Sequence, residues 1–150
     1  MTIREFVPYL SVTNAKEAVA FYSRVFETEP TNLLHMPDGR VMHCEFVCGG
    51  ARFLLSEELP EHGGTPSPQS LGGTTVAIHL YVDDCDAIVA SMQGNDAEVL
   101  MPPEDMFWGE RFGRVRDPFG HEWGIATRLH EMTPDEIKAA AAKLFENMSE

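Results

Sequence analysis

The sequence predicts an α+β protein made of two tandem β-α-β-β-β modules. Residues 7–12 and 77–82 carry the same apolar pattern at an offset of seventy residues. The same offset places Gly50 on Gly120 without a gap. A repeat of this size indicates two similar modules related by a pseudo-twofold axis, with a site built between them. We expect module one at 1–57, a linker at 58–73, module two at 74–128 and an additional helix at 133–148.

The elements of module one follow from local patterns. Residues 6–12 alternate between apolar and polar side chains, which predicts a strand. Asn14 with Glu17 forms a capping box, and the helix that it begins has apolar residues at helical spacing up to Phe26. Further strands are expected at 33–36, 41–48 and 51–57, with Gly49-Gly50 as a hairpin turn between the last two.

The connection between the modules is rich in glycine, proline and serine from Pro60 to Gly73. This composition is typical of a mobile segment, and it fits a passive linker and a lid over a site equally well. Module two then repeats the pattern of module one, with Asp83-Asp84 as the cap of a helix that ends at Gly94. Its strands are expected at 75–82, at 98–101 before Pro102-Pro103, at 111–116 after an insertion at 104–109, and at 121–127.

The tail after the repeat is a strong candidate for a helix. Thr133 supplies an N-cap, Pro134 stands at the first helical position and Glu136 completes a capping box. The helix carries one apolar stripe, made of Ile137, Ala140, Ala141, Leu144, Phe145 and Met148. We expect this stripe to dock on its own domain, with a second subunit as the alternative.

The composition excludes several functional classes. With 43% apolar and 23% charged residues, the chain is typical of a soluble globular protein. A formal net charge of −13 argues against nucleic acid as a partner and is compatible with a cationic ligand. The sequence shows no apolar run of membrane-spanning length and no signal peptide. The three cysteines are an odd number, which favours a reduced, cytoplasmic protein.

Several motifs resemble the vicinal-oxygen-chelate superfamily, and specifically its PhnB-like glyoxalase/bleomycin-resistance/dioxygenase group. They are Pro8-Tyr9-Leu10, the stretch from Met106 to Gly113, the turn Asp117-Pro118-Phe119-Gly120, and the helix start at Thr133. The resemblance covers nearly the whole chain. It implies a curved mixed sheet whose concave face encloses a small-molecule site, with helices on the convex face. It also implies a homodimer.

In the metal-dependent members of that superfamily, the ligands come from the first and last strands of each module. The resemblance places those positions at Val7, Leu54, Ala77 and Gly124. None of these side chains is a metal donor. We therefore expect no metal ion and no other cofactor. The alternative is a displaced metal site made of His43, Glu45, His79 and Glu122, which share sheet faces with the expected positions.

The candidate ligand-binding residues are polar and aromatic side chains expected to face the cavity. They are Tyr9, His43, Glu45, His79, Trp108, Arg111 and Glu122. For Trp108 and Arg111 the alternative is structural, with the indole packed at a rim and the guanidinium paired to a nearby acid. His43 and Glu45 are either an acid–base pair or a cross-strand pair on a wet face. Cys44 is expected in the core rather than as a reactive thiol.

Three functional hypotheses remain open from the sequence. The first is a metal-free protein that binds a small organic molecule, with catalysis unassigned. The second is a metal-dependent lyase, isomerase or dioxygenase that uses the displaced site. The third is a structural or interaction module that uses the C-terminal helix as its contact.

Overall fold

The computed structural model describes residues 1–149 and confirms an α+β fold of two tandem modules. The strands hydrogen-bond into two four-stranded sheets, one from each module. The chain divides into two compact units. Unit one is Met1–Ile78 with Asp117–Glu122, and unit two is His79–Arg116 with the chain from Trp123 onward. A concave cavity between the modules stays a prediction.

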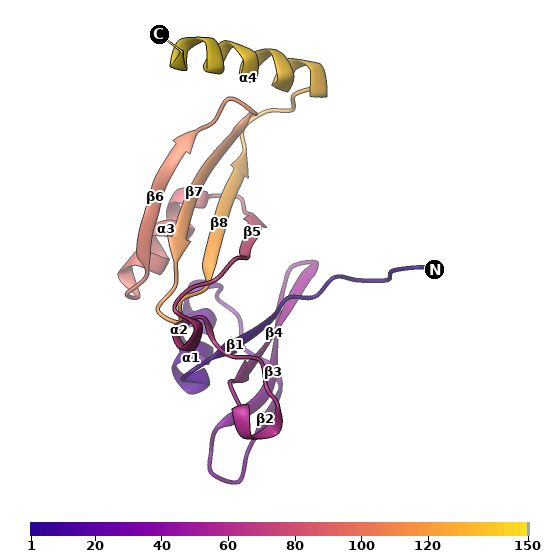
Figure 1. Cartoon of the computed structure of the whole chain (residues 1–150), viewed down its shortest axis with the longest axis vertical. Coiled ribbons are helices and arrows are strands. Elements are labelled where there is room, and N and C mark those ends of the chain that lie inside the picture. The colour runs from indigo at the N-terminus through magenta and orange to yellow at the C-terminus, as the bar shows by residue number, and fades with distance from the viewer. Residues whose placement is uncertain (150) are drawn as a thin grey trace. The chain divides into compact units, whose positions relative to one another are not determined.

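Module one contains one helix and four strands (Figure 1). The elements are β1 (Tyr9–Val12), α1 (Ala15–Val25), β2 (Thr31–His35), β3 (Val41–Cys48) and β4 (Ala51–Glu57). The strand order is β1-β4-β3-β2, in which β1 runs parallel to β4 and the other pairs are antiparallel. Strand β1 is therefore an edge of the sheet. Asn14 caps α1 as predicted, since its side chain accepts a hydrogen bond from the backbone N–H of Glu17.

The core of unit one is aromatic. Helix α1 buries Phe21 and Tyr22, which contact Phe119 at ring-centroid distances of 5.8 and 6.1 Å. The hydroxyl of Tyr22 donates to buried Asp117 at 2.5 Å, and Asp117 also accepts from the backbone N–H of Phe119. Phe119 and Trp123 are both buried.

The connection between the modules is structured and attached to unit one. It contains a 3-10 turn, η1 (Pro60–His62), and a short helix, α2 (Pro68–Leu71), which the sequence analysis did not predict. The Glu58 carboxylate accepts from the backbone N–H of Ser67 and from the Ser70 hydroxyl, each at 2.5 Å. These bonds lower the pKa of Glu58, since they stabilise its charged form.

Module two repeats the topology of module one. It contains β5 (Ala77–Tyr81), α3 (Cys85–Gly94), β6 (Glu98–Asp105), β7 (Glu110–Arg116) and β8 (Glu122–Arg128), in the sheet order β5-β8-β7-β6. In Figure 1, β8, β7 and β6 run side by side. The prediction that Pro102-Pro103 would end this strand of module two at Met101 was wrong, because β6 continues to Asp105.

Strand β6 tolerates its prolines for two reasons. It lies at the sheet edge, where a missing N–H removes no bond from a second neighbour. Its pairing with β7 shifts register between Met101 and Glu104, around the proline pair. Opposite them stands Gly113, where a Cβ atom would approach the Pro103 ring to 3.2 Å.

The seventy-residue repeat extends to hydrogen bonds that hold each helix to its sheet. The first N–H of α1, on Ala15, donates to the Glu57 carboxylate at 2.8 Å. Seventy residues later, the N–H of Cys85 donates to the Thr127 hydroxyl at the same distance. The repeat does not hold at Gly50 and Gly120, since Gly120 has a φ of +90° whereas Gly50 is not left-handed.

The C-terminal helix α4 (Pro134–Met148) has the predicted capping box between Thr133 and Glu136. It buries none of its side chains. The expected docking of its stripe on its own domain was therefore wrong. Within residues 1–149, no helix is long and apolar enough to cross a membrane.

Candidate functional site

Three of the predicted site residues lie together on the sheet of module one. Tyr9 pairs with Leu54 of β4, and Leu54 pairs in turn with Glu45 of β3. The Tyr9 hydroxyl forms a 3.0 Å hydrogen bond with Nδ1 of His43. We call the surface formed by Tyr9, His43, Glu45 and Leu54 the module-one face. Its hydroxyl, imidazole and carboxylate are hydrogen-bonding groups suited to a polar ligand.

Ion pairing fixes the charge of this face. Nη1 of Arg52 donates to Glu45 at 2.5 Å, and the Asn32 side-chain amide donates to the second carboxylate oxygen. The bond from Asn32, followed by those from Arg52, lowers the pKa of Glu45. Arg52 also makes a two-bond contact with Glu5, at 3.0 and 2.9 Å. Glu45 is thus held as a carboxylate, which makes it a poor general acid.

The sheet of module two carries aromatic side chains instead. The His79 ring stacks on Phe112 with centroids 5.5 Å apart, and Tyr81 meets the edge of His79 at 4.9 Å. Gly124 makes the stack possible, because a Cβ atom there would come within 2.9 Å of His79 Nδ1 and 3.0 Å of Phe112. We call the surface formed by His79, Tyr81, Phe112 and Gly124 the module-two face.

Trp108 belongs near this aromatic group. Its ring lies 6.1 Å from that of Phe112, and its indole N–H donates to Glu110 at 3.0 Å. Glu122, another predicted site residue, is the first residue of β8 and is half-buried.

Arg111 is not brought to the module-two face. It alternates with Phe112 along β7 and so points to the opposite side of the sheet, where α3 lies. Its guanidinium makes bonds of 2.5 and 2.9 Å to Asp86 of α3 and one of 3.0 Å to Asp105. The Arg111 guanidinium lowers the pKa of Asp86. The structural alternative for Arg111, pairing with a nearby acid, is the one that the structure shows.

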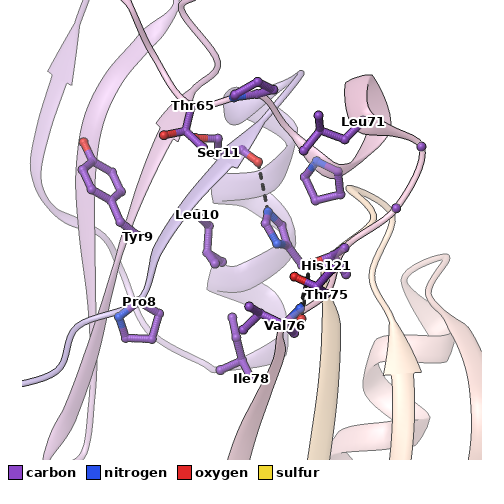
Figure 2. A pocket seen from close by; sticks show the side chains of 15 residues that line it. Pro8, Tyr9, Leu10, Ser11, Thr65, Leu71, Thr75, Val76, Ile78 and His121 are labelled. Atoms are coloured by element: carbon purple, nitrogen blue, oxygen red, sulfur yellow. Dashed lines mark hydrogen bonds between the residues drawn. The ribbon is translucent and has the colours of Figure 1, made fainter.

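Unit one contains a cavity of about 660 Å³ beside the free edge of β1 (Figure 2). We call it the edge cavity. Of the seven predicted ligand-binding residues, it is lined by Tyr9 alone. Its other lining residues come from β1, from the connection and from the turn before β8, and they include Leu10, Ser11, Leu71, Thr75, Val76 and His121. The sequence allowed the connection to be a lid or a passive linker, but no local pattern indicated which of its side chains would line a cavity.

The comparisons with known proteins agree with this architecture. The model of the Glyoxalase/Bleomycin resistance protein/Dioxygenase superfamily matches residues 3–125. The chain belongs to this superfamily. The match spans both modules and ends within β8, so the C-terminal helix lies outside it.

Relatives within and near the superfamily extend over most of the chain. The uncharacterized protein Mb0911c of Mycobacterium bovis is 38% identical over 135 residues, which are 89% of each chain. The crystal structure of protein PA1353 from Pseudomonas aeruginosa has a TM-score of 0.69 at 24% identity, with 84% of this chain and 98% of that chain covered. TioX from Micromonospora sp. ML1 has a TM-score of 0.61 at 27% identity, with 87% and 100% covered.

The resemblance to the superfamily expects metal ligands at four positions of this chain, and the residues there are not metal donors. Val7, Leu54, Ala77 and Gly124 provide no imidazole, carboxylate or thiolate. At Gly124 the neighbouring space is taken by the His79 and Phe112 rings. Across residues 1–149, no three His, Cys, Asp or Glu side chains gather as a metal site requires.

The cysteines provide no nucleophile on either face. Cys44 is fully buried, as the sequence predicted, and burial raises the pKa of its thiol to about 11. At neutral pH it is therefore an unreactive thiol. Cys85 is also buried, and its pKa is likewise raised by desolvation.

Proposed function

We propose that this protein binds a small organic molecule without a metal ion or another cofactor, and that its ligand-binding residues lie on or beside the sheet of each module, taken separately. Membership of the superfamily supports binding of a small molecule. The observation that carries the metal-free part is Gly124, where a donor side chain would collide with the His79–Phe112 stack. The proposed ligand-binding residues are Tyr9, His43, Glu45, His79, Trp108 and Glu122.

Each face, considered by itself, supports contact with a different kind of ligand group. The module-one face offers a hydroxyl, an imidazole and a carboxylate, whereas the module-two face offers stacked rings. Glu45 and the net charge of −13 favour a cationic group on the ligand, since a negative field concentrates cations. We assign no catalytic role to any of these residues.

Metal-free bleomycin, a cationic organic molecule, is a suitable probe for this proposal. Isothermal titration should give saturable binding that is unchanged by a chelator. His43→Ala and Tyr9→Phe should each weaken binding by about tenfold, as expected when one hydrogen bond to a charged or polar group is lost. His62→Ala, which removes an exposed imidazole from η1, is the matched control and should leave the affinity unchanged.

Metal analysis tests the cofactor part separately. Protein purified without added metal should contain far less than one equivalent of any divalent ion. Its melting temperature should not rise with Zn²⁺, Ni²⁺, Mn²⁺ or Fe²⁺, because an ion that binds the folded state would stabilise it. Stoichiometric metal that is lost in His79→Ala would instead establish the displaced site and a metal-dependent enzyme.

We also propose that the protein is a cytoplasmic homodimer in which the α4 helices contribute to the subunit contact. Leu144, Phe145 and Met148 are 40%, 60% and 73% exposed. Ile137, Ala141, Leu144 and Met148 follow the alternating four- and three-residue spacing with which helices pack against one another. The free cysteines favour a reducing compartment.

Light scattering after size-exclusion chromatography tests the dimer. The full chain should have twice the monomer mass of 16.7 kDa, and Leu144→Glu with Phe145→Glu should shift it toward monomer. Lys138→Glu with Lys143→Glu changes the charge of the same helix outside the stripe and is the control. A monomeric wild-type chain, or a dimer unaffected by the stripe variant, would remove α4 from the interface.

A further inference from the structure

The edge cavity contains no charged side chain, although the chain as a whole is rich in charge. None of its fifteen lining residues is Asp, Glu, Lys or Arg, whereas 35 of the 150 residues of the chain are. Apolar side chains supply much of the wall, namely Pro8, Leu10, Pro66, Pro68, Leu71, Val76 and Ile78. A charged ligand would lose its hydration here without gaining an ion-pair partner, which is costly.

The wall formed by the connection is anchored from outside the cavity. Ser67 is fully buried, and its N–H and the Ser70 hydroxyl are held by Glu58. Pro68 packs so closely on Gly120 that a Cβ atom there would approach it to 2.8 Å. Gln69 donates to the carbonyl of Pro118 at 3.1 Å. These contacts fix α2 beside β1, and a preformed cavity costs a ligand less ordering than a loop that must close.

Two large apolar side chains of this wall remain in water. Leu71 and Val76 are 68% and 66% exposed, although both line the cavity. Burial of apolar surface is the main favourable term when a ligand enters such a site, at about 25 cal/mol per Å². The same side chains contribute no favourable binding free energy for a small, strongly hydrated ligand.

The polar groups of the cavity are hydroxyls, an imidazole and backbone groups. Nε2 of His121 lies 3.0 Å from the carbonyl oxygen of Ser11, on the edge of β1 that faces away from β4 (Figure 2). Because that oxygen is an acceptor, Nε2 is the donor in this bond. Ser11, Thr65 and Thr75 also line the cavity and bring hydroxyl groups to it.

We propose that the edge cavity is a binding site for an uncharged, mostly apolar organic molecule that carries one or two hydrogen-bonding groups. The volume of about 660 Å³ falls within the range of small-molecule sites. This site lies within unit one and does not depend on the ligand of the two sheet faces. It needs neither the ion-paired Glu45 nor the aromatic stack of module two.

Three probes of one shape and different charge test the proposal at pH 7. They are 1-naphthol, which is neutral, 1-naphthoate, which is an anion, and 1-naphthylmethylammonium, which is a cation. Amide shifts in ¹⁵N-labelled full-length protein should locate 1-naphthol at residues 9–11, 71–76 and 121. Its dissociation constant should be below about 1 mM, and both ions should bind at least about tenfold more weakly.

A charged substitution at the exposed rim sharpens this test. Val76→Lys should weaken 1-naphthol and strengthen 1-naphthoate, which would reverse their order. Val47→Lys is the matched control, because Val47 is 49% exposed in the same unit but does not line the cavity. Leu71→Trp, which fills the cavity from the exposed rim, should abolish binding of 1-naphthol while the spectrum stays that of the folded protein.

Equal affinity for the three probes would overturn the proposal, as would shifts confined to the module-one face. Unchanged binding of 1-naphthol to both Val76→Lys and Leu71→Trp would also overturn it. None of these results bears on the binding of bleomycin to the sheet faces, which His43→Ala tests independently.

Discussion

The two modules share one strand order but use their sheet faces for different chemistry. The module-one face carries a hydroxyl–imidazole pair and a carboxylate held by Arg52. The module-two face carries stacked rings, with His79 lying between Phe112 and Tyr81. Leu54 and Gly124 occupy equivalent positions seventy residues apart. Leu54 places a side chain on its face, whereas Gly124 leaves space for the rings of His79 and Phe112.

This difference shows that the repeat specifies the backbone and leaves the faces free to diverge. The helix-to-strand hydrogen bonds recur at the same offset, with Glu57 in one module and Thr127 in the other. The turns after β2 and β6 also recur, since Met36 and Met106 each accept from a left-handed glycine three residues on. The side chains on the two sheet faces are free to differ between the modules, because no backbone hydrogen bond of the repeat depends on them.

The largest expected loss of stability comes from a substitution that fills the space at Gly124. Gly124→Ala should destabilise the fold by about 1–3 kcal/mol, because the added methyl group must displace the rings of His79 and Phe112. Gly50→Ala is the control, since no atom lies within 4 Å of its Cβ position and its φ is not left-handed. Denaturant unfolding measures both. Equal changes in the free energy of unfolding would contradict the packed arrangement on the module-two face.

An intermediate effect on stability is expected at the helix-to-strand hydrogen bonds that the two modules share. Thr127→Val removes the acceptor for Cys85 N–H and the bond that Thr127 donates to the Val82 carbonyl. Its cost should be about 1–2 kcal/mol. Glu57→Met removes the carboxylate acceptor of the Ala15 N–H and should cost about 0.5–1 kcal/mol.

Conservative variants at these positions provide the controls. Thr127→Ser and Glu57→Gln each retain an oxygen acceptor, so each should lose less than half as much stability in the same unfolding experiment. If Thr127→Ser is as damaging as Thr127→Val, the methyl group rather than the hydroxyl holds α3.

The smallest expected effect is a pH dependence of the melting temperature. It should be seen for a variant of Glu58 and not for a variant of Arg128, the residue that lies seventy positions later in the repeat. Hydrogen bonds from Ser70 and Ser67 lower the pKa of Glu58 below its ordinary value of 4.5. A lowered pKa contributes stability above that ordinary value, and the contribution is lost as pH falls through the folded-state value. Glu58→Gln should therefore melt at a lower temperature than wild type at pH 7, and the gap should narrow below pH 4.5.

Arg128→Gln is the contrasting variant. The Arg128 guanidinium lies 4.8 Å from the centre of the Tyr81 ring, a contact without a carboxylate, the type of group that acid protonates between about pH 3 and pH 7. Its difference from wild type in melting temperature should stay constant over that range. A Glu58→Gln gap that is equally constant would mean that the connection is not held through the carboxylate.

The sequence by itself determined the features that depend on neighbours along the chain. The hairpin signal at Gly49-Gly50 separated β3 from β4 at their observed bounds, and the capping residues Asn14, Asp84 and Thr133 each begin a helix. The burial of Cys44 also followed, since local patterning distinguishes an inward from an outward position.

Tertiary structure decided the features that depend on distant partners. Arg111 pairs with Asp86, which lies 25 residues earlier, and so turns away from the module-two face. Strand β6 continues through Pro102-Pro103 because its place at the sheet edge and Gly113 on β7 accommodate them. The connection forms a wall of the cavity because Glu58 accepts hydrogen bonds from Ser67 and Ser70, at the start of α2. Pro68 of α2 also packs against Gly120. Such contacts have no local signal, since the energies that select them arise only when the folded chain brings the partners together.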